Sequence, residues 1–255
     1  TWTVNPQNRI NLTVFATPFT SGGNGKYPLG NQSGLPPAQL AGSYTALANK
    51  NAGNVINTLL NWTTETADKR FLVDTRVGYQ FQELSSGASD GSRVNSGQGL
   101  SETPGAIFRR NANGNFRSIN EFEPVPGNIC DPITAPAGAP PNFVRFRCPV
   151  TNYNAGGPGF LQDTNTHRIV ARSVATVLAE ALGHHVAKAG FEFEYVSYQS
   201  ARGYSGGNLF RENLTGARWD DFRNYNYTTQ PDAFVPVKAL NWTTQSFGVG
   251  GFIQD

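Results

Sequence analysis

The stretch Phe71-Leu-Val-Asp-Thr-Arg-Val-Gly-Tyr-Gln-Phe-Gln82 shows the clearest alternation of polar and apolar residues in the sequence. Large apolar side chains recur at every second position, and the polar side chains of Asp74, Arg76 and Gln80 lie between them. Successive side chains of a strand point to opposite faces, so this period of two predicts a β-strand with one apolar face and one polar face. The apolar members are Phe71, Val73, Val77, Tyr79 and Phe81.

Two further stretches show the same alternation, one near the start of the chain and one near residue 190. The apolar positions are Ile10, Leu12 and Val14 in the first stretch and Phe191, Phe193 and Tyr195 in the second. Lys188, Glu192 and Glu194 alternate with the latter set. Residues 1–4, 55–64 and 239–255 add weaker candidates, which gives about seven strands. The sequence therefore predicts an all-β fold of antiparallel strands.

The segment Arg168–Leu182 fits two interpretations. It is rich in Ala, Leu and Glu, a composition typical of a helix. Its side chains also alternate, and the segment leads directly into the predicted turn at Gly183. This position favours a strand, with an amphipathic helix as the alternative.

The connections between these strands differ systematically in length. Short polar turns are predicted near residues 5–8, 67–70 and 183–185, whereas long loops are predicted near 17–52, 85–166 and 202–238. Compact soluble domains rarely contain loops longer than about 12–15 residues. Outer-membrane barrels combine short periplasmic turns with long extracellular loops. The order of turns and loops therefore predicts one partial transmembrane β-barrel domain over residues 1–255, with extracellular loops.

The barrel prediction assigns the two faces of each strand to different surroundings. The apolar faces are expected to meet lipid, and the polar faces, which carry Asp74, Arg76 and Glu192, are expected to line the lumen. Aromatic residues near the strand ends are expected to form interfacial girdles. These girdle candidates are Trp62, Tyr79, Phe81, Tyr195 and Tyr198. The predicted lipid-facing residues are Ile10, Leu12, Val14, Phe71, Val73, Val77, Tyr79, Phe81, Phe191, Phe193 and Tyr195.

The number of predicted strands indicates an incomplete barrel. Single-chain bacterial barrels use an even number of strands, eight or more, whereas this sequence offers about seven. An open sheet edge cannot face lipid, because its N–H and C=O groups would have no partners. The strands therefore belong to a fragment of a larger barrel or to one chain of an assembly, and we favour the fragment.

Composition and cysteine content exclude several classes of protein. Charged residues make up 15% of the chain and the net charge is +2, so nothing indicates a nucleic-acid partner. No apolar run reaches about 18 residues, so no transmembrane helix is predicted. Cys130 and Cys148 lie in a long Pro/Gly/Asn-rich stretch without metal-ligand spacing. A structural disulfide that closes one loop is the better interpretation of this pair.

No motif in the sequence indicates catalysis. Glu180, His184 and His185 do not match a known zinc spacing, so a turn is the better interpretation. Asp220 and Asp221 are interpreted as solvated loop charges, and no Gly-x-Ser-x-Gly motif occurs. We expect no enzyme, no cofactor and no metal site, and the sequence does not identify ligand-binding residues.

The hairpin from Leu182 to Glu194, Leu-Gly-His-His-Val-Ala-Lys-Ala-Gly-Phe-Glu-Phe-Glu, resembles a barrel hairpin of TonB-dependent outer-membrane receptors. It is most similar to those of the Oar-like group. The stretch Thr244–Asp255 resembles a strand of the same family that enters its Phe-x-Gln-Asp turn, and the hairpin Asn5–Pro18 fits as well. The resemblance covers about half of the chain, and its motifs are short.

The resemblance implies a ligand-gated importer in the bacterial outer membrane. Such receptors enclose a plug domain in a barrel of about 22 strands. Extracellular loops capture a ligand, here unknown, and the TonB system supplies energy through the plug. No plug is recognised in this sequence. The alternatives are a soluble secreted β-sandwich that binds ligands as a lectin or adhesin, and a secreted carbohydrate-active enzyme, for which no carboxylate pair is found.

Overall fold

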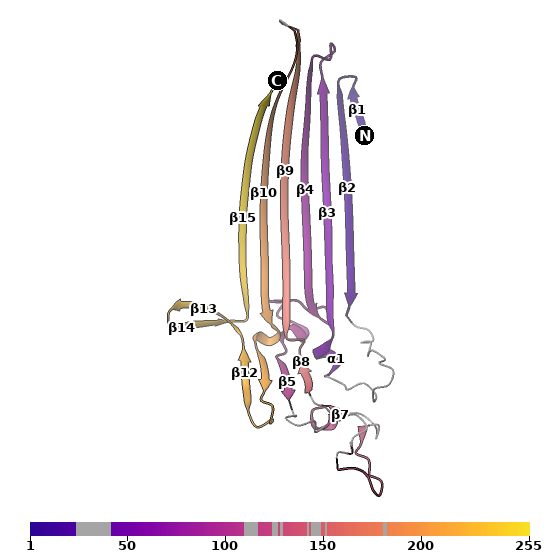
Figure 1. Cartoon of the computed structure of the whole chain (residues 1–255), viewed down its shortest axis with the longest axis vertical. Coiled ribbons are helices and arrows are strands. Elements are labelled where there is room, and N and C mark those ends of the chain that lie inside the picture. The colour runs from indigo at the N-terminus through magenta and orange to yellow at the C-terminus, as the bar shows by residue number, and fades with distance from the viewer. Residues whose placement is uncertain are drawn as a thin grey trace.

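A computed structural model describes residues 1–23, 42–109, 117–123, 127, 130–141, 143, 149–150, 152–180 and 183–255. Its main element is a seven-stranded antiparallel sheet in the order β1-β2-β3-β4-β9-β10-β15 (Figure 1). The order of the strands in the sheet is thus the same as their order along the chain. The strands are β1 (Trp2–Asn5), β2 (Asn8–Gly22), β3 (Asn49–Glu65), β4 (Phe71–Ala88), β9 (Phe160–Glu180), β10 (His184–Tyr204) and β15 (Ala239–Gln254). The all-β prediction is confirmed, and the sheet is not closed into a barrel.

β9 shows that strand pairing overrides a helical composition. The segment from Arg168 forms strand as far as Glu180, and residues 181–182 lie outside the described residues. β9 pairs with β4 on one side and with β10 on the other. Both ladders satisfy its backbone groups and pack its side chains, which outweighs the helix propensity of Ala and Leu. The strand interpretation is correct and the helical alternative is wrong.

The two ends of the sheet differ, and we call them the turn side and the loop side. On the turn side, short connections join β1 to β2, β3 to β4 and β9 to β10 (top of Figure 1). On the loop side, the strands extend into the regions predicted as loops, with β2 reaching Gly22, β4 reaching Ala88 and β10 reaching Tyr204. These extensions lack an apolar face, so the period of two that identifies a strand is absent there.

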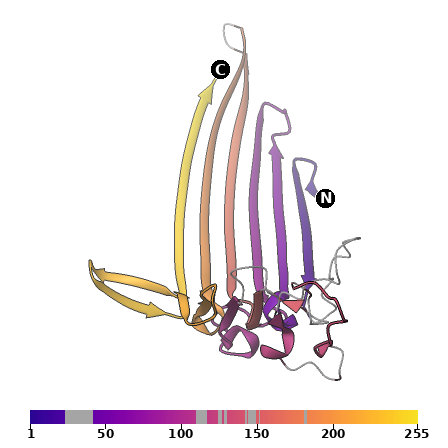
Figure 2. The same cartoon turned by 60° about the horizontal axis from the view of Figure 1, so that its bottom comes forward.

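The loop-side connections fold together into a small cap (Figure 2). The cap contains a four-stranded sheet in the order β12-β11-β5-β8. β5 and β8 come from the connection between β4 and β9, and β11 and β12 come from the connection between β10 and β15. The sheet therefore joins two separate connections. β5 and β11 run parallel. A backbone bridge links Gly42, beside the short helix α1, to Asn154 of β8. The bounds are α1 (Tyr44–Leu47), β5 (Gly105–Arg109), β8 (Asn152–Gly156), β11 (Leu209–Glu212) and β12 (Trp219–Arg223).

Smaller elements complete the loop side. The hairpin β13–β14 extends sideways from the loop-side end of β15 in both views (Figures 1 and 2). The remaining elements are β6 (Arg117–Ser118), β7 (Pro149–Val150), β13 (Tyr225–Gln230), β14 (Ala233–Val237) and the 3₁₀ turns Gly99–Glu102, Ile119–Glu121 and Ser205–Gly207. No helix in the described part of the chain has the length and apolar character needed to cross a membrane.

Buried apolar groups concentrate on the loop side. One cluster combines Ile119, Cys130, Val150 and Tyr153 in the cap, with Phe108 and Phe122 packed against it. A second cluster joins Val94 to Leu161 and Ala239 at the loop-side ends of β9 and β15. The turn-side part of the sheet instead exposes large apolar side chains such as Leu12 and Ile253.

Candidate functional site: the two faces of the seven-stranded sheet

Strand pairing aligns side chains of one kind across the whole sheet. We use the term register row for residues that are direct partners on successive strands. One row through the middle of the sheet contains Leu12, Leu60, Val77, Ala171, Phe193 and Val249. The adjacent row, one residue away, contains Asn11, Asn61, Arg76, Arg172, Glu192 and Gly250. Because adjacent rows point to opposite faces, the sheet has an apolar face and a polar face.

The apolar face contains a continuous band of exposed and partly exposed hydrophobic side chains. The register places every predicted lipid-facing residue, from Ile10 to Tyr195, on this face. The band runs from Phe71 to Phe81 on β4 and from Ile169 to Ala179 on β9. Each segment spans 11 positions of its strand, and a membrane strand needs about 9–11 residues. The band therefore has the length of a transmembrane segment, and the strands continue beyond it on the loop side.

Aromatic residues lie near the two ends of the apolar band. Trp62 lies on the turn side, where its indole N–H donates to Asn8 Oδ1 at 3.2 Å. On the loop side, Tyr79 and Tyr195 flank Ile169 in one register row, and the Tyr79 hydroxyl bonds with His167 Nδ1 at 2.9 Å. The polar ends of these rings thus find partners while their apolar bodies stay in the band.

One girdle candidate lies on the wrong face. Tyr198 pairs with Thr166 and Thr244, in rows that belong to the polar face. The expectation that Tyr198 contributes to an aromatic girdle at the lipid interface is therefore wrong. The alternation of polar and apolar residues ends before Tyr198, so the sequence gives no pattern that assigns this residue to a face.

The polar face carries a network of opposite charges. The guanidinium Nε of Arg168 lies 2.7 Å from Glu194 Oε1, and the Nε of Arg76 lies 3.0 Å from Asp74 Oδ1. Arg172 has Arg76 as its partner on one side and Glu192 on the other. These charges are partly exposed, so they add little stability and mainly define a hydrophilic surface.

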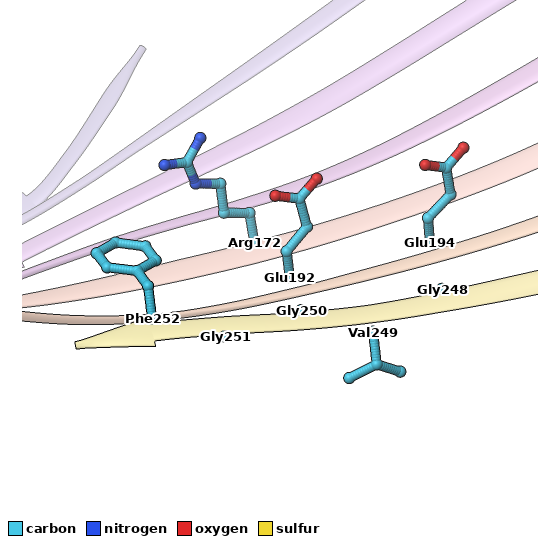
Figure 3. Close-up of a pocket in the computed structure, with 8 residues that line it drawn as sticks. All are labelled: Arg172, Glu192, Glu194, Gly248, Val249, Gly250, Gly251 and Phe252. Atoms are coloured by element: carbon cyan, nitrogen blue, oxygen red, sulfur yellow. The ribbon is translucent and has the colours of Figure 1, made fainter.

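A hollow of about 290 Å³ lies at the β15 end of this network (Figure 3). Arg172, Glu192 and Glu194 project from one side of the sheet, and Val249 projects from the opposite side (Figure 3). Gly250 and Gly248 are the β15 partners of the two glutamates. A Cβ at either glycine would meet no atom within 4 Å, so the surface of β15 is open beside the two glutamates.

Two glycines within the sheet are covered by aromatic rings from the neighbouring strand. Gly190 is the direct partner of Phe252, and Gly53 is the direct partner of Phe19. A Cβ at Gly190 would lie 2.2 Å from the Phe252 ring, and a Cβ at Gly53 would lie 2.5 Å from the Phe19 ring. Each ring therefore occupies the space that a side chain on its partner would fill, and both glycines are required for this packing.

The remaining sequence-predicted sites lie outside the two faces. Cys130 is buried in the cap, whereas Cys148 lies outside the described residues, so their disulfide stays a prediction. Glu180 and His184 are direct partners beside the β9–β10 turn, where His184 Nδ1 lies 3.9 Å from Glu180 Oε1. Asp220 lies in β12 and accepts a hydrogen bond from Arg218 Nε at 2.9 Å. Within the described ranges, no group of three or more His, Cys, Asp or Glu residues could hold a metal ion.

The exposure of the apolar face does not favour a soluble β-sandwich. Such a fold packs the apolar face of one sheet against a second sheet. Here Phe247 is 80% exposed and Ile253 is 90% exposed. The apolar face instead has the character of a surface that meets an apolar solvent.

Comparison with known proteins agrees with the resemblance seen in the hairpin residues. The chain is 33% identical over 264 residues to the TonB-dependent transporter Oar of Myxococcus xanthus. The match covers 100% of this chain, and the chain spans 24% of the length of that protein. No protein-family model matches the chain. The predicted resemblance to Oar-like TonB-dependent receptors is confirmed.

Proposed function

Because this chain is similar over its whole length to a part of an Oar-like TonB-dependent transporter, we propose that it forms part of the barrel wall of an outer-membrane receptor and transporter. The observation that carries this proposal is the apolar band of the seven-stranded sheet, backed by a charged face. The band faces lipid, and the face of Arg76, Arg172 and Glu192 lines the lumen. Outside the band, the strands rise above the membrane and support the cap.

The free edges of the sheet support a wall that continues on both sides. β15 pairs with β10 alone, and β2 pairs beyond Ile10 with β3 alone, among the strands that the structure describes. Unpaired backbone groups are not tolerated in the hydrocarbon region. Further strands of the same polypeptide pair with these edges and close the barrel. The greater length of the relative agrees with this proposal.

The loop side of the sheet is extracellular in this proposal, and the turn side is periplasmic. The cap then stands at the outer mouth of the barrel, where it contributes to the capture of an extracellular ligand. Import requires a plug domain, not identified in this chain, through which the TonB system supplies energy. The length asymmetry of the connections supports this orientation.

Surface labelling of intact cells tests the orientation. Thr229→Cys places a thiol in the exposed hairpin β13–β14, and Ala67→Cys places one in an exposed turn-side connection. A membrane-impermeant maleimide is expected to label the full-length Thr229→Cys variant in intact cells, and the Ala67→Cys variant only after the cells are lysed. The parent protein measures the background from Cys130 and Cys148. Labelling of the turn-side thiol in intact cells contradicts the orientation, and absence of the protein from the outer-membrane fraction contradicts the proposed function.

A further inference from the structure

An arginine without an ion-pair partner lies on the polar face near the loop-side end of the sheet. Arg202 of β10 has Gln162 and Leu240 as its direct partners, and both are neutral. Among the described residues, no carboxylate forms an ion pair with it. Arg76 and Arg168, on the same face within the band, each pair with a carboxylate. The polar face thus has compensated charges in the band and an uncompensated cation beyond it.

An aromatic ring holds this cation in place. The Cζ atom of Arg202 lies 5.1 Å from the centroid of the Trp242 ring. Such a contact orients a guanidinium group without neutralising its charge. Arg202 is partly exposed, whereas its Nε is buried and has no hydrogen-bond partner in the described part of the chain. A ligand therefore meets the guanidinium group through its two terminal nitrogens.

A hollow of about 310 Å³ lies near Arg202, where the sheet meets the cap. Phe160 and Tyr204 line it from the sheet, and Ile107 and Leu209 line it from the cap. Tyr204 follows Arg202 by two positions on the same face, or about 7 Å along the strand. The other lining residues are mostly small, and they include Ala46, Gly105, Ala106, Ala155, Gly157 and Gly159. The volume is that of a small ligand pocket, for which about 300 Å³ is the lower limit.

The charges around this hollow have one sign. Arg223 of β12 also lines it, and no Asp or Glu belongs to the described lining. Tyr225 stacks on Tyr204 at a centroid distance of 5.5 Å. Burial raises the pKa of Tyr225, the neighbouring Tyr204 adds to the rise, and Arg202 opposes it. Tyr225 therefore stays neutral and supplies no anion to Arg202.

We propose that Arg202 and this hollow together bind an extracellular ligand that carries a carboxylate on an aromatic ring system. The terminal nitrogens of Arg202 donate to the carboxylate oxygens, a charge-assisted pair that fits the planar shape of both groups. The ligand ring lies in the hollow against the rings of Phe160 and Tyr204. The cation attracts the carboxylate, and the apolar lining selects for the ring.

The position of the site agrees with capture from outside the cell. Arg202 lies seven residues beyond Tyr195, a residue of the last apolar row of the band, which is about 23 Å along the strand. The site therefore lies above the membrane, on the face that lines the lumen in the proposed orientation. This inference rests on the proposed function and assigns its ligand to a chemical class.

Binding of 2-naphthoate to the full-length receptor in lipid nanodiscs tests the site, with empty nanodiscs as the background. Arg202→Gln is expected to weaken binding at least about ten-fold, because it removes the charge-assisted hydrogen bonds. Arg218→Gln is the matched control, since Arg218 lies outside the hollow and has Asp220 as its partner at 2.9 Å. Ala46→Phe narrows the hollow from α1 and should weaken binding about five-fold. Neutral 2-naphthamide should bind the parent about ten-fold more weakly than 2-naphthoate.

The outcomes separate the inference from the proposed function. Failure of the parent protein to assemble in the outer membrane overturns the proposed function and this inference with it. If the parent assembles but binds no 2-naphthoate, or binds it no better than Arg202→Gln does, the inference alone is overturned. Equal binding of 2-naphthoate and 2-naphthamide overturns the role of the carboxylate. Tighter binding of 2-naphthyl phosphate than of 2-naphthoate overturns the assignment to a carboxylate, whereas weaker binding supports it.

Discussion

Ile253 lies near the turn-side end of β15 and is 90% exposed, whereas Leu161 lies near the loop-side end of β9 and is 1% exposed. Both are aliphatic residues on the same face of one sheet. Leu161 packs against Val94 and Ala239, as in a protein that folds in water. Ile253 belongs to a band without such cover. The contrast agrees with the proposed orientation, in which water surrounds the loop side and lipid surrounds the turn-side band.

The largest expected effect comes from the core of the cap. Tyr153 is 1% exposed, its ring stacks on Phe122 at a centroid distance of 5.4 Å, and its hydroxyl donates to Glu123. Tyr153→Ala is expected to destabilise the cap by about 3–5 kcal/mol, because it leaves a cavity in a small core. Limited proteolysis of the assembled protein should then cleave the cap while the membrane strands stay protected. Phe234→Ala, at a residue that is 64% exposed in the hairpin, serves as the control. If the cap of Tyr153→Ala resists the protease as well as the parent cap does, the cap is not stabilised by a buried apolar core around Tyr153.

The apolar band should respond to charge rather than to cavities. Val77 lies in the middle of the band and is 41% exposed. Val77→Arg is expected to destabilise the assembled barrel by about 2–4 kcal/mol, the range for a cation on the lipid face at mid-bilayer. Gln80→Arg, on the polar face of the same strand, should have little effect. Heat-modifiable mobility in gels and urea unfolding in vesicles measure both variants. Equal stability of the two contradicts the assignment of the faces.

The sequence predicted the band well because alternation is a local property. On β4, each residue from Phe71 to Phe81 has its face determined by its immediate neighbours, and the register then aligns that strand with the next. A slip of one residue would move Val77 to the polar face and Arg76 to the apolar face, so the pattern also determines the register. The same reasoning explains why the polar face, with Arg76 and Glu192, could be predicted.

The cap could not be predicted from the same kind of signal. Its parallel pairing joins Gly105–Ile107 to Leu209–Arg211, two short segments separated by about a hundred positions. Strands of this length show too few alternations to be distinguished from loop. Groups of residues from different strands cannot be predicted for a related reason. Asp163, Gln199 and Thr243 lie on three strands, and only the register brings them close together.

A smaller effect is expected where an aromatic ring covers a glycine. Phe252 covers Gly190 near the turn side, and Phe19 covers Gly53 near the loop side. Cross-strand pairs of this kind contribute about 0.2–1 kcal/mol, so Phe252→Ala and Phe19→Ala should each lower the free energy of unfolding by that amount. Urea titration in vesicles measures both. Similar losses of unfolding free energy in the two variants show that the ring–glycine contact contributes equally on the turn side and on the loop side. A loss in one variant alone shows that the contribution of the contact depends on the side of the sheet.

The smallest expected effect is a pH dependence that distinguishes two turns, one on each side of the sheet. Burial raises the pKa of Asp90, but hydrogen bonds from Ser92 and the Leu100 backbone N–H outweigh it and leave this pKa below its usual value. Because the folded pKa is lowered, the stabilisation is present above the unfolded pKa of about 3.9 and is lost as the pH falls through the folded pKa. On the turn side, a hydrogen bond from the Thr66 hydroxyl lowers the pKa of Asp68 in the same direction.

The consequence of protonation should differ between these two turns. Asp90 connects Ser92 to Leu100 across a loop that has little other backbone pairing, so acidification should loosen residues 89–100. Asp68 lies between β3 and β4, whose long ladder holds both ends of the turn in place. Hydrogen exchange measured by mass spectrometry between about pH 5 and pH 3, corrected for intrinsic rates, should therefore show lost protection in the loop but not in the flanking strands. Asp90→Asn should remove the pH dependence of the loop, and Asp68→Asn should leave it unchanged. If β3 and β4 lose as much protection as residues 89–100, the turn at Asp68, rather than the β3–β4 ladder, stabilises the turn-side end of the sheet.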